Sequence, residues 1–377
     1  MADQRRTKVT KTVVIKLGSA VAVDPSGSTR RETIARLGRE VGELQAQGWG
    51  VLLVVSGAVS RGKAARGIGQ AQGLPLADLQ AVSAVGQGHL FREVAESFGE
   101  AGVETGQMLL TFSEVSNRDS YPRVRAALTK LLEWRVVPVL NENDSVTSEG
   151  VSFGNNDFLA AQVAALLGSR RLVFLGSVAG VMDDDPRRNR AARLLAEIDD
   201  VERLLAETVD ARLPEKSATQ GRGGIRGKLR AAQLASLRDI PVVIGSLGVD
   251  SLRDLAVGTG AGTFVRPSGA LKSQRASFRF WLEHARPSAG EVVVDEGAAR
   301  AIRRNGASLL AVGIRKSSGE FAAGDVVVIE DPAGTPIARG ICRYSARELR
   351  LLQRAGWKVE GEELEEVVHR DEMVLKD

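Results

Sequence analysis

The order of apolar segments constrains the fold of this 377-residue chain more than any other feature. Over the first 265 residues, short runs of Val, Leu and Ile alternate with longer stretches whose apolar residues recur at helical spacing. The short runs lack polar alternation, which is typical of strands buried on both faces. A repeat of strand, helix and strand predicts a mostly parallel open sheet with helices on both sides, that is, a three-layer α/β/α sandwich.

The candidate strands and helices of this part can be located from the same pattern. The strands are TVVIKL, VLLVV, TGQMLL, VVPVL, RLVFL and PVVIG, at residues 12–17, 51–55, 105–110, 136–140, 171–175 and 241–245. The helices span residues 31–47, 119–134 and 228–237. The first helix is the clearest, because Ile34, Leu37, Val41 and Leu44 share one face and Gly48 follows as a stop.

The pattern changes near residue 266, and the length of the chain favours about two or three domains. Residues 266–289 are polar and predict a linker after a first domain of residues 1–265. Residues 290–366 hold the short β-like runs EVVVD, SLLAVGI, DVVVIED and PIARGICRYS and one helix candidate, residues 296–304. Turn residues separate these runs, which predicts a small β-barrel-like domain. We expect residues 367–377 to form a tail outside it.

Composition narrows the class of protein. Hydrophobic content of 43% and charged content of 26% are those of a globular protein. No apolar run approaches the roughly 20 residues of a membrane helix, and the N-terminus lacks the apolar core of a secretory signal. We therefore expect a cytoplasmic protein without a membrane span. The single cysteine, Cys342, and three scattered histidines argue against disulfides and a structural zinc site.

The charge is unevenly distributed. The chain carries a net +4, but residues 290–377 carry 13 Lys or Arg against 16 Asp or Glu. The basic excess therefore lies in the first domain, which suits a phosphorylated or carboxylate ligand, although ordinary surface arginines explain it equally well. RNA-binding domains usually present a basic face, so we do not expect the C-terminal domain to bind RNA. Salt-sensitive retention on an RNA column would reverse that expectation.

A glycine-rich stretch, QGRGGIRGKL at residues 220–229, invites a test against nucleotide-binding motifs. It is not a P-loop, because Arg222 stands where the first Gly is required and Leu229 where Ser or Thr is required. It is not GxGxxG either, because Arg226 occupies the last Gly position. Small residues before Lys228 at a helix start still suit an anion. A surface loop without a ligand is the alternative that the residues leave open.

Polar residues follow three of the predicted strands. Lys16 lies near the end of a buried strand, where an unpaired ammonium is costly, so a functional role is favoured. Ser56 and Gly57 follow the next strand, although a plain helix cap explains Ser56 equally well. After VVPVL come Asn141, Glu142, Asn143 and Asp144, and then Asn155, Asn156 and Asp157 before the apolar run FLAAQVAALL. Ligands of open parallel sheets bind at such strand ends.

Taken together, these segments resemble the amino acid kinase family and, within it, the glutamate 5-kinase group. The similar pieces are IKLGSA, VVSGAVSRG, AVSAVGQGHL, GQMLLT, VPVLNENDSV and FGNNDFLAAQVA, in the family's order across most of residues 11–265. The segments GEVVVDEGAARAI and GASLLAVGI resemble the PUA domain that many bacterial members of this group append. The resemblance implies the amino acid kinase fold followed by a PUA domain.

The resemblance also implies an activity. Members of this group transfer the γ-phosphoryl group of ATP, with Mg²⁺, to the side-chain carboxylate of L-glutamate, the first step of proline biosynthesis. It implies feedback inhibition by proline, a homo-oligomer (dimer or tetramer) and a glutamyl phosphate reductase as a partner. Alternatives are a related kinase with another nucleotide or amino acid, such as aspartate, and a weakly active chain acting through RNA or protein binding by its PUA-like domain.

Roles for individual residues follow from the same resemblance. Glutamate is a zwitterion, which carboxylate and amide side chains can hold. The implied glutamate site comprises Ser56, Gly57, Asn141, Asn143, Asp144 and Asn156, with Glu142 shaping the loop. Asp157 would orient the catalytic lysines Lys16 and Lys228. A bare Asn/Asp-rich turn fits one polar cluster but fits two poorly. The acceptor carboxylate is ionised at neutral pH, with a pKa of about 4.3, so no general base is needed.

The nucleotide half departs from the family pattern. Where the family usually has Thr-Asp, this chain has Gly176-Ser177, and Met182 stands where the family commonly has an aromatic residue. The family's GTGGMxTK segment is GRGGIRGK in this chain. The implied nucleotide contacts are Lys16, Gly18, Gly176, Ser177, Arg222, Gly223, Gly224, Ile225, Arg226, Gly227 and Lys228. We hypothesise that Arg222 and Arg226 supplement phosphate binding. Arg222→Ala should then raise the KM for ATP, and an unchanged KM would contradict the hypothesis.

Overall fold

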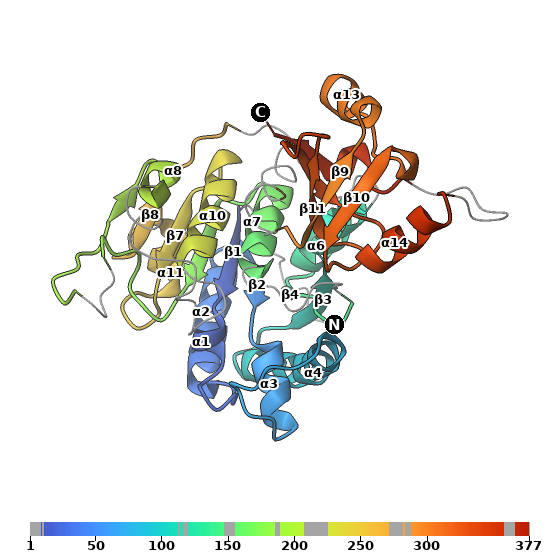
Figure 1. The fold of residues 1–377 in the computed structure, drawn as a ribbon. Helices are drawn as coiled ribbons and strands as arrows, with labels where there is room; N and C mark the ends of the chain where they lie inside the picture. The colour runs from blue at the N-terminus through green and yellow to red at the C-terminus, as the bar shows by residue number, and fades with distance from the viewer. Residues whose placement is uncertain are drawn as a thin grey trace. The chain divides into compact units, whose positions relative to one another are not determined.

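The computed structural model describes residues 9, 11–111, 114–115, 120–146, 155–184, 189–206, 225–270, 282, 288–357 and 366–376. The chain divides into two compact units, the first within residues 1–274 and the second within residues 275–377. Figure 1 shows their elements in chain order, from blue to red. None of the described helices has both the length and the apolar composition needed to cross a membrane.

The first unit is built on an eight-stranded sheet with the order β3-β4-β2-β1-β5-β7-β8-β6. The strands are β1 (Lys11–Leu17), β2 (Trp49–Val55), β3 (Thr105–Leu110), β4 (Val137–Glu142), β5 (Arg171–Leu175), β6 (Glu197–Ile198), β7 (Val242–Gly245) and β8 (Thr263–Val265). All neighbours pair in parallel except β7 and β8. The mostly parallel sheet expected from the sequence is thus confirmed, with two short strands, β6 and β8, that the sequence pattern did not indicate.

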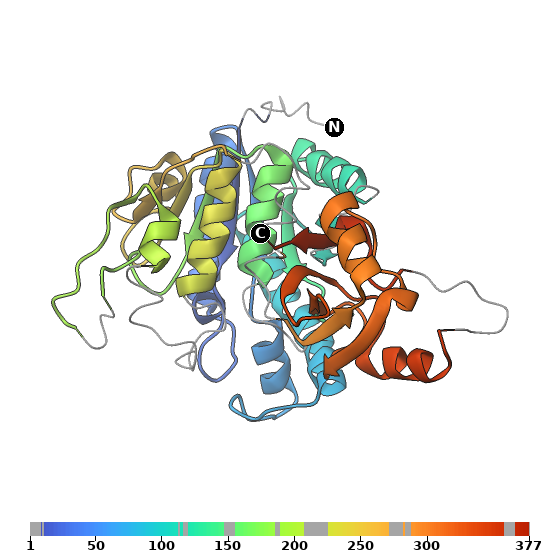
Figure 2. The ribbon, with the colours of Figure 1, turned by 45° about the horizontal axis from the view of Figure 1, so that its top comes forward.

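Helices cover both faces of this sheet. They are α1 (Ser19–Ala22), α2 (Arg31–Ala46), α3 (Ala58–Ala65), α4 (Leu76–Glu100), α6 (Tyr121–Glu133), α7 (Asn155–Leu167), α8 (Val201–Leu204), α10 (Ile225–Leu237) and α11 (Leu252–Val257). On one face, Val13 and Ile15 of β1 share a buried core with Leu37 of α2 and Leu90 of α4. Figures 1 and 2 show α7 and α10 side by side on this sheet, and α7 packs on β1. Lys16 alternates with Ile15, so it points to the face opposite that core.

Two glycines bring α3 and α4 into direct backbone contact. A Cβ atom on Gly62 of α3 would lie 1.9 Å from the carbonyl oxygen of Val82. A Cβ atom on Gly86 of α4 would lie 1.8 Å from the carbonyl oxygen of Ala58. Only glycine permits this approach. The sequence pattern did not indicate α4, because the many Ala, Gly and Ser residues of this helix dilute the apolar periodicity on which a helix prediction depends.

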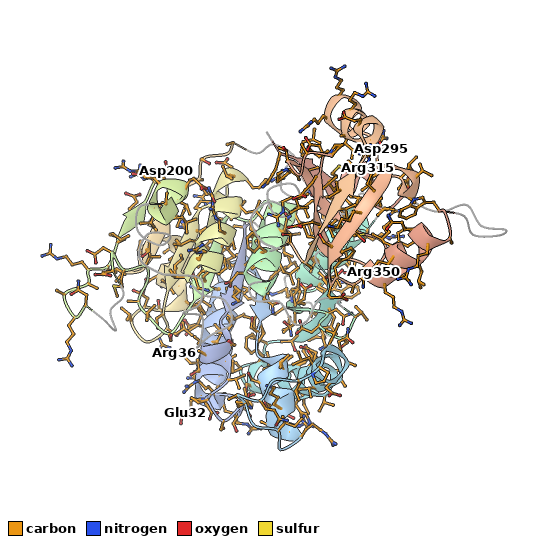
Figure 3. The ribbon with its side chains drawn as sticks, viewed as in Figure 1. Glu32, Arg36, Asp200, Asp295, Arg315 and Arg350 are labelled. Carbon is orange, nitrogen blue, oxygen red and sulfur yellow. The ribbon has the colours of Figure 1, made fainter. Side chains whose placement is uncertain are left out.

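The second unit has a five-stranded sheet of its own with the order β10-β9-β11-β12-β13. Its elements are β9 (Gly290–Val294), α13 (Glu296–Asn305), η3 (Ala311–Gly313), β10 (Ile314–Gly319), β11 (Val326–Glu330), β12 (Pro336–Ile341), α14 (Ala346–Arg354), η4 (Arg370–Glu372) and β13 (Met373–Leu375). Asp295 caps α13 by accepting a hydrogen bond of 2.7 Å from the N–H of Ala298, and Figure 3 labels its side chain.

The C-terminal segment differs from the expectation. Residues 367–377 were expected to form a tail, yet β13 pairs with β12 and the side chains of Val367 and Val368 are fully buried. These apolar residues complete the core of the second unit, so its fold extends to Leu375. The run SLLAVGI was expected to be β-like, but η3 occupies its centre and β10 begins only at its last residue.

Two further differences concern the linker and α14. The predicted linker began at residue 266, but the N–H groups of Ser268 and Gly269 donate to the carbonyl oxygen of Ser236 at 2.9 and 3.0 Å. The start of that stretch therefore packs on the first unit. Helix α14 was not predicted, although Ser345 and Glu348 form a capping box at its start.

Candidate active site

The site lies where β1, β2 and β4 end. These strands are neighbours in the order β4-β2-β1-β5, so their carboxyl ends meet at one edge of the sheet. Lys16 is the sixth residue of β1, and Asn141 and Glu142 are the last two of β4. Helix α7 adds Asn156 and Asp157 in its first turn. The fold therefore brings together the polar residues that the sequence placed after β1, after β4 and at the start of α7.

Lys16, Asp157 and Lys228 form a charged cluster. The carboxylate of Asp157 has no solvent exposure, and the Nζ atom of Lys16 lies 2.7 Å from its Oδ1. The Nζ atom of Lys228, in the first turn of α10, lies 3.4 Å from both carboxylate oxygens. One carboxylate thus holds two ammonium groups, and the cluster retains a surplus positive charge that suits an anionic ligand.

Burial and charge act in opposite directions on this cluster. Burial is the largest influence on Asp157 and would raise its pKa, but the ammonium groups of Lys16 and Lys228 outweigh it and the pKa is lowered. For Lys228, burial lowers the pKa, Lys16 lowers it further and Asp157 opposes both. Asp157 therefore stays ionised at neutral pH, and an anion near Lys228 would favour its protonated form.

An aromatic ring forms a wall of the charged cluster. The Nζ atom of Lys228 lies 5.0 Å from the ring centroid of Phe174, within the range of a cation–π contact. Phe174 is fully buried on β5 and is the register partner of Lys16 on β1, so both side chains lie on one face of the sheet. The segment RLVFL was predicted only as a strand, and Phe174 was not predicted as a site residue. A strand pattern does not indicate which helix residue packs against the strand.

Side-chain amides form a second network beside the first. The N–H of Glu142 donates to Oδ1 of Asn156 at 2.9 Å, and Nδ2 of Asn156 donates to Oδ1 of Asn141 at 2.8 Å. Nδ2 of Asn141 then donates to Oε1 of Gln87 at 2.5 Å. We call these three side chains, Asn156, Asn141 and Gln87, the amide chain. Gln87 was not predicted as a site residue, although it lies in the segment AVSAVGQGHL that carried the family resemblance.

The remaining predicted acceptor residues lie close by. Ser83 of α4, also not predicted, donates through its hydroxyl to Oδ2 of Asp144 at 3.1 Å. The N–H of Asn143 donates to the carbonyl oxygen of Leu110 at 3.0 Å, which fixes the chain beyond β4. Ser56 directly follows β2, and the next residue, Gly57, has a φ of 126°. A Cβ atom on Gly57 would lie only 2.6 Å from Cγ2 of Val23, so no larger residue fits there. Gly57 is therefore required by the turn itself.

The predicted nucleotide residues are described only in part. The N–H of Gly18 donates to the carbonyl oxygen of Leu175 at 3.1 Å, and the N–H of Gly176 donates to that of Gly245 at 2.8 Å. Ser177 is exposed just beyond β5. Ile225, Arg226 and Gly227 form the start of α10 with Lys228. Arg222, Gly223 and Gly224 lie outside the described residues. Within the described ranges, no three His, Cys, Asp or Glu side chains gather as a metal site.

Comparison with known proteins shows which family the chain belongs to. Residues 11–246 match the model of the amino acid kinase family, and residues 290–360 match that of the PUA domain. The chain belongs to the amino acid kinase family. This confirms the resemblance inferred from the sequence, and every strand of the eight-stranded sheet except β8 lies within the matched residues.

The relatives share nearly the whole length of the chain. The glutamate 5-kinase of Syntrophus aciditrophicus is 34% identical over 98% of this chain and 95% of its own. Those of Syntrophotalea carbinolica and Streptomyces coelicolor are each 36% identical, over 97% and 96% of this chain and 97% and 96% of their own. UMP kinase from Bacillus anthracis is a solved structure similar over 68% of this chain and 96% of its own, with a TM-score of 0.48 and 18% identity. Family membership rests on the sequence matches and not on that structure.

Proposed function

We propose that this protein is a glutamate 5-kinase, which transfers the γ-phosphoryl group of ATP to the side-chain carboxylate of L-glutamate. The observation that carries the proposal is the pairing of two networks on adjacent residues. Asp157 holds two ammonium groups, while Asn156 belongs to the amide chain. Cations suit a transferring phosphoryl group, and amides suit a carboxylate acceptor. Relatives named glutamate 5-kinase over nearly the full length support the same activity.

The proposed reaction needs neither a covalent intermediate with the protein nor a general base. A glutamate carboxylate is already ionised at neutral pH, with a pKa of about 4.3, so it attacks the γ-phosphorus without a general base. A bond forms between a carboxylate oxygen and the phosphorus, the bond from phosphorus to the β-phosphate oxygen breaks, and ADP leaves. In this proposal Lys16 and Lys228 lie around the transferring group, and Asp157 holds both ammonium groups in place.

The donor is proposed to be ATP with Mg²⁺. The surplus positive charge of the cluster fits a polyphosphate, and Mg²⁺ bound mainly through ATP oxygens and water would neutralise further charge when bound. Gly18, Gly176 and Ser177 follow β1 and β5 at the same sheet edge, where nucleotide phosphates would approach the backbone. We propose that Arg222 and Arg226 add phosphate contacts.

The acceptor is proposed to lie against β2, β4 and α7. Asn156 and Asn141 would donate N–H groups to its carboxylates, and Asp144, held by Ser83, would accept from its ammonium. Ser56, Gly57 and Asn143 would complete the site. Proline would compete for the same pocket, so Asp144→Ala should alter both glutamate saturation and any inhibition by proline.

Family membership supplies the remaining partners of the proposal. An acyl phosphate hydrolyses readily, so a glutamyl phosphate reductase that consumes it is proposed as a partner, in a pathway toward proline. A homo-oligomer is proposed for the kinase unit, and a regulatory or assembly role for the PUA domain. We propose a cytoplasmic location, where both glutamate and ATP are available.

Hydroxamate formation tests the proposal directly. Purified protein is incubated with Mg-ATP, hydroxylamine and either glutamate or aspartate, and hydroxylamine traps any acyl phosphate. We expect glutamate-dependent hydroxamate that is lost in Lys16→Ala. Product with aspartate and not with glutamate would overturn the assigned substrate. No product with either amino acid would overturn the proposed reaction.

A further inference from the structure

Gln87 ends the amide chain on a helix that the family resemblance did not assign to the site. We propose that Gln87 is a positioning residue that fixes the orientation of the Asn141 amide, so that the chain presents N–H groups to an acceptor carboxylate. The inference deepens the proposed function and rests on it.

The direction of the amide chain is fixed at one end by the backbone. The N–H of Glu142 can only donate, so the atom of Asn156 that lies 2.9 Å from it is an oxygen. The other atom of that amide is then a nitrogen, and it donates to Oδ1 of Asn141. The same reasoning makes the atom of Asn141 that faces Gln87 a nitrogen, donating to Oε1. Every link therefore runs in the same direction.

This direction decides what the chain can offer to a ligand. The carbonyl oxygens of Asn156, Asn141 and Gln87 each accept a hydrogen bond within the chain. Each amide nitrogen carries two hydrogens, so one hydrogen on each Asn and both on Gln87 are not used by these links. Each oxygen already accepts one hydrogen bond within the chain, while every nitrogen keeps hydrogens to donate, so the chain can offer N–H donors to an acceptor group such as a carboxylate.

Gln87 is the far anchor of this arrangement. Asn141 is only 2% exposed, so its amide nitrogen depends on the protein for a partner, and Oε1 of Gln87 supplies it at 2.5 Å. Without that oxygen, the buried amide nitrogen of Asn141 would lack a hydrogen-bond partner, which costs free energy. The side-chain amide of Asn141 would then rotate to find another partner. Rotation would turn Oδ1 of Asn141 away from Asn156, which would disturb the donor arrangement at the acceptor site.

The backbone of Gln87 is held rigidly enough for this role. The preceding residue, Gly86, is in contact with Ala58 of α3, where a Cβ atom would lie 1.8 Å from the carbonyl oxygen. Helix α3 begins directly after Gly57, so α4 is fixed against the turn that carries Ser56. Ser83 lies one helical turn before Gln87 and binds Asp144. One face of α4 therefore supports both a donor network and a carboxylate.

A buried glutamine can also be a purely structural residue, and Gln45 provides a matched control. Gln87 and Gln45 are both 8% exposed, and Nε2 of Gln45 donates to the carbonyl oxygen of Arg135 at 2.9 Å, outside the site. Gln87→Met and Gln45→Met remove the same amide and keep a similar length. Glutamate affinity is measured by calorimetry, and the KM for glutamate and for ATP by hydroxamate formation.

For Gln87→Met, we expect the Kd and KM for glutamate to rise about tenfold or more, with the KM for ATP within about twofold of wild type. Gln45→Met should leave all three unchanged. Gln87→Glu gives a second readout. Its ionised carboxylate still accepts from Asn141 but offers no N–H and adds negative charge. The rise in KM relative to wild type should shrink as the pH is lowered from 8 to 5.5, because burial raises the pKa of a carboxyl group.

Glutamate Kd and KM at wild-type values in Gln87→Met would overturn the inference. So would an equal rise in the KM for ATP, which indicates general loosening. If wild type binds glutamate but forms no hydroxamate, the proposed function fails, while the Kd ratio of the two Met variants still decides the role of Gln87. If wild type does not bind glutamate, both the proposed function and this inference are overturned.

Discussion

Two polar networks meet on α7, and they differ in kind. Asp157 belongs to a charged cluster with Lys16 and Lys228, whereas its neighbour Asn156 belongs to a neutral chain with Asn141 and Gln87. Successive helix residues point about 100° apart, so one turn can serve both networks without mixing them. Charge attracts without much regard to angle, while amide hydrogen bonds are weaker and directional. We therefore expect the charged cluster to govern kcat and the amide chain to govern recognition of the acceptor.

The largest effect is expected from Asp157→Asn. This change leaves two buried ammonium groups without their counter-charge, which costs about 3–5 kcal/mol for comparable buried pairs. We expect kcat to fall about a thousandfold per folded molecule, with little change in the Kd for glutamate. Steady-state hydroxamate kinetics and calorimetry measure the two quantities. Asp331→Asn, which removes the 2.9 Å ion pair with Arg303 in the second unit, is the control and should leave kcat unchanged.

A smaller effect, confined to the amide side, is expected from Gly86→Ala. The added Cβ atom would lie 1.8 Å from the carbonyl oxygen of Ala58 and must push α4 away from α3. Overpacking of this kind costs about 1–3 kcal/mol, and displacement of Gln87 and Ser83 should raise the KM for glutamate more than that for ATP. Gly88→Ala on the same helix meets no atom within 4 Å and should be neutral or stabilising. Equal stability of the two variants in urea would contradict the account.

The aromatic wall of the charged cluster is tested by Phe174→Leu. Removal of a cation–π contact costs about 0.5–2 kcal/mol, so we expect kcat to fall several-fold with an unchanged KM for glutamate. The pKa of Lys228 is already lowered by burial, and loss of the ring should lower it further. Activity requires the protonated amine, which is lost as the pH rises through that pKa. The alkaline limb of the pH profile should therefore move to lower pH. An unmoved limb would argue against the contact.

The smallest effect is expected from Ser83→Ala. Loss of one hydrogen bond to the Asp144 carboxylate is worth about 1 kcal/mol, which predicts a rise of several-fold in the KM for glutamate. Ser97→Ala is a matched control on the same helix, because its hydroxyl donates to the carbonyl oxygen of Glu93 at 2.9 Å. Similar KM values for the two variants would show that Ser83 does not act through Asp144.

Much of the fold could be predicted from the sequence, but fewer of the residues that support the site from behind its predicted side chains could be. Unalternated apolar runs located the central strands, and the cost of a buried ammonium singled out Lys16. Gln87 and Ser83 escaped notice because the small residues of α4 hide its helical period. Phe174 escaped because a strand pattern carries no information about the lysine above it. The strand β13 was missed because its pairing with β12 is a long-range contact that local pattern does not encode.

Two neighbouring single-atom exchanges test the division between the networks most directly. Asn156→Asp keeps the oxygen that accepts from the N–H of Glu142 but removes the donors, and Asp157→Asn removes the charge that holds the lysines. Glutamate Kd by calorimetry and kcat by hydroxamate formation are measured for both. We expect a raised Kd for glutamate with a largely retained kcat for Asn156→Asp, and a lowered kcat with a largely retained Kd for Asp157→Asn. If both exchanges change the same parameter to a similar extent, the two networks are not separate and the account is contradicted.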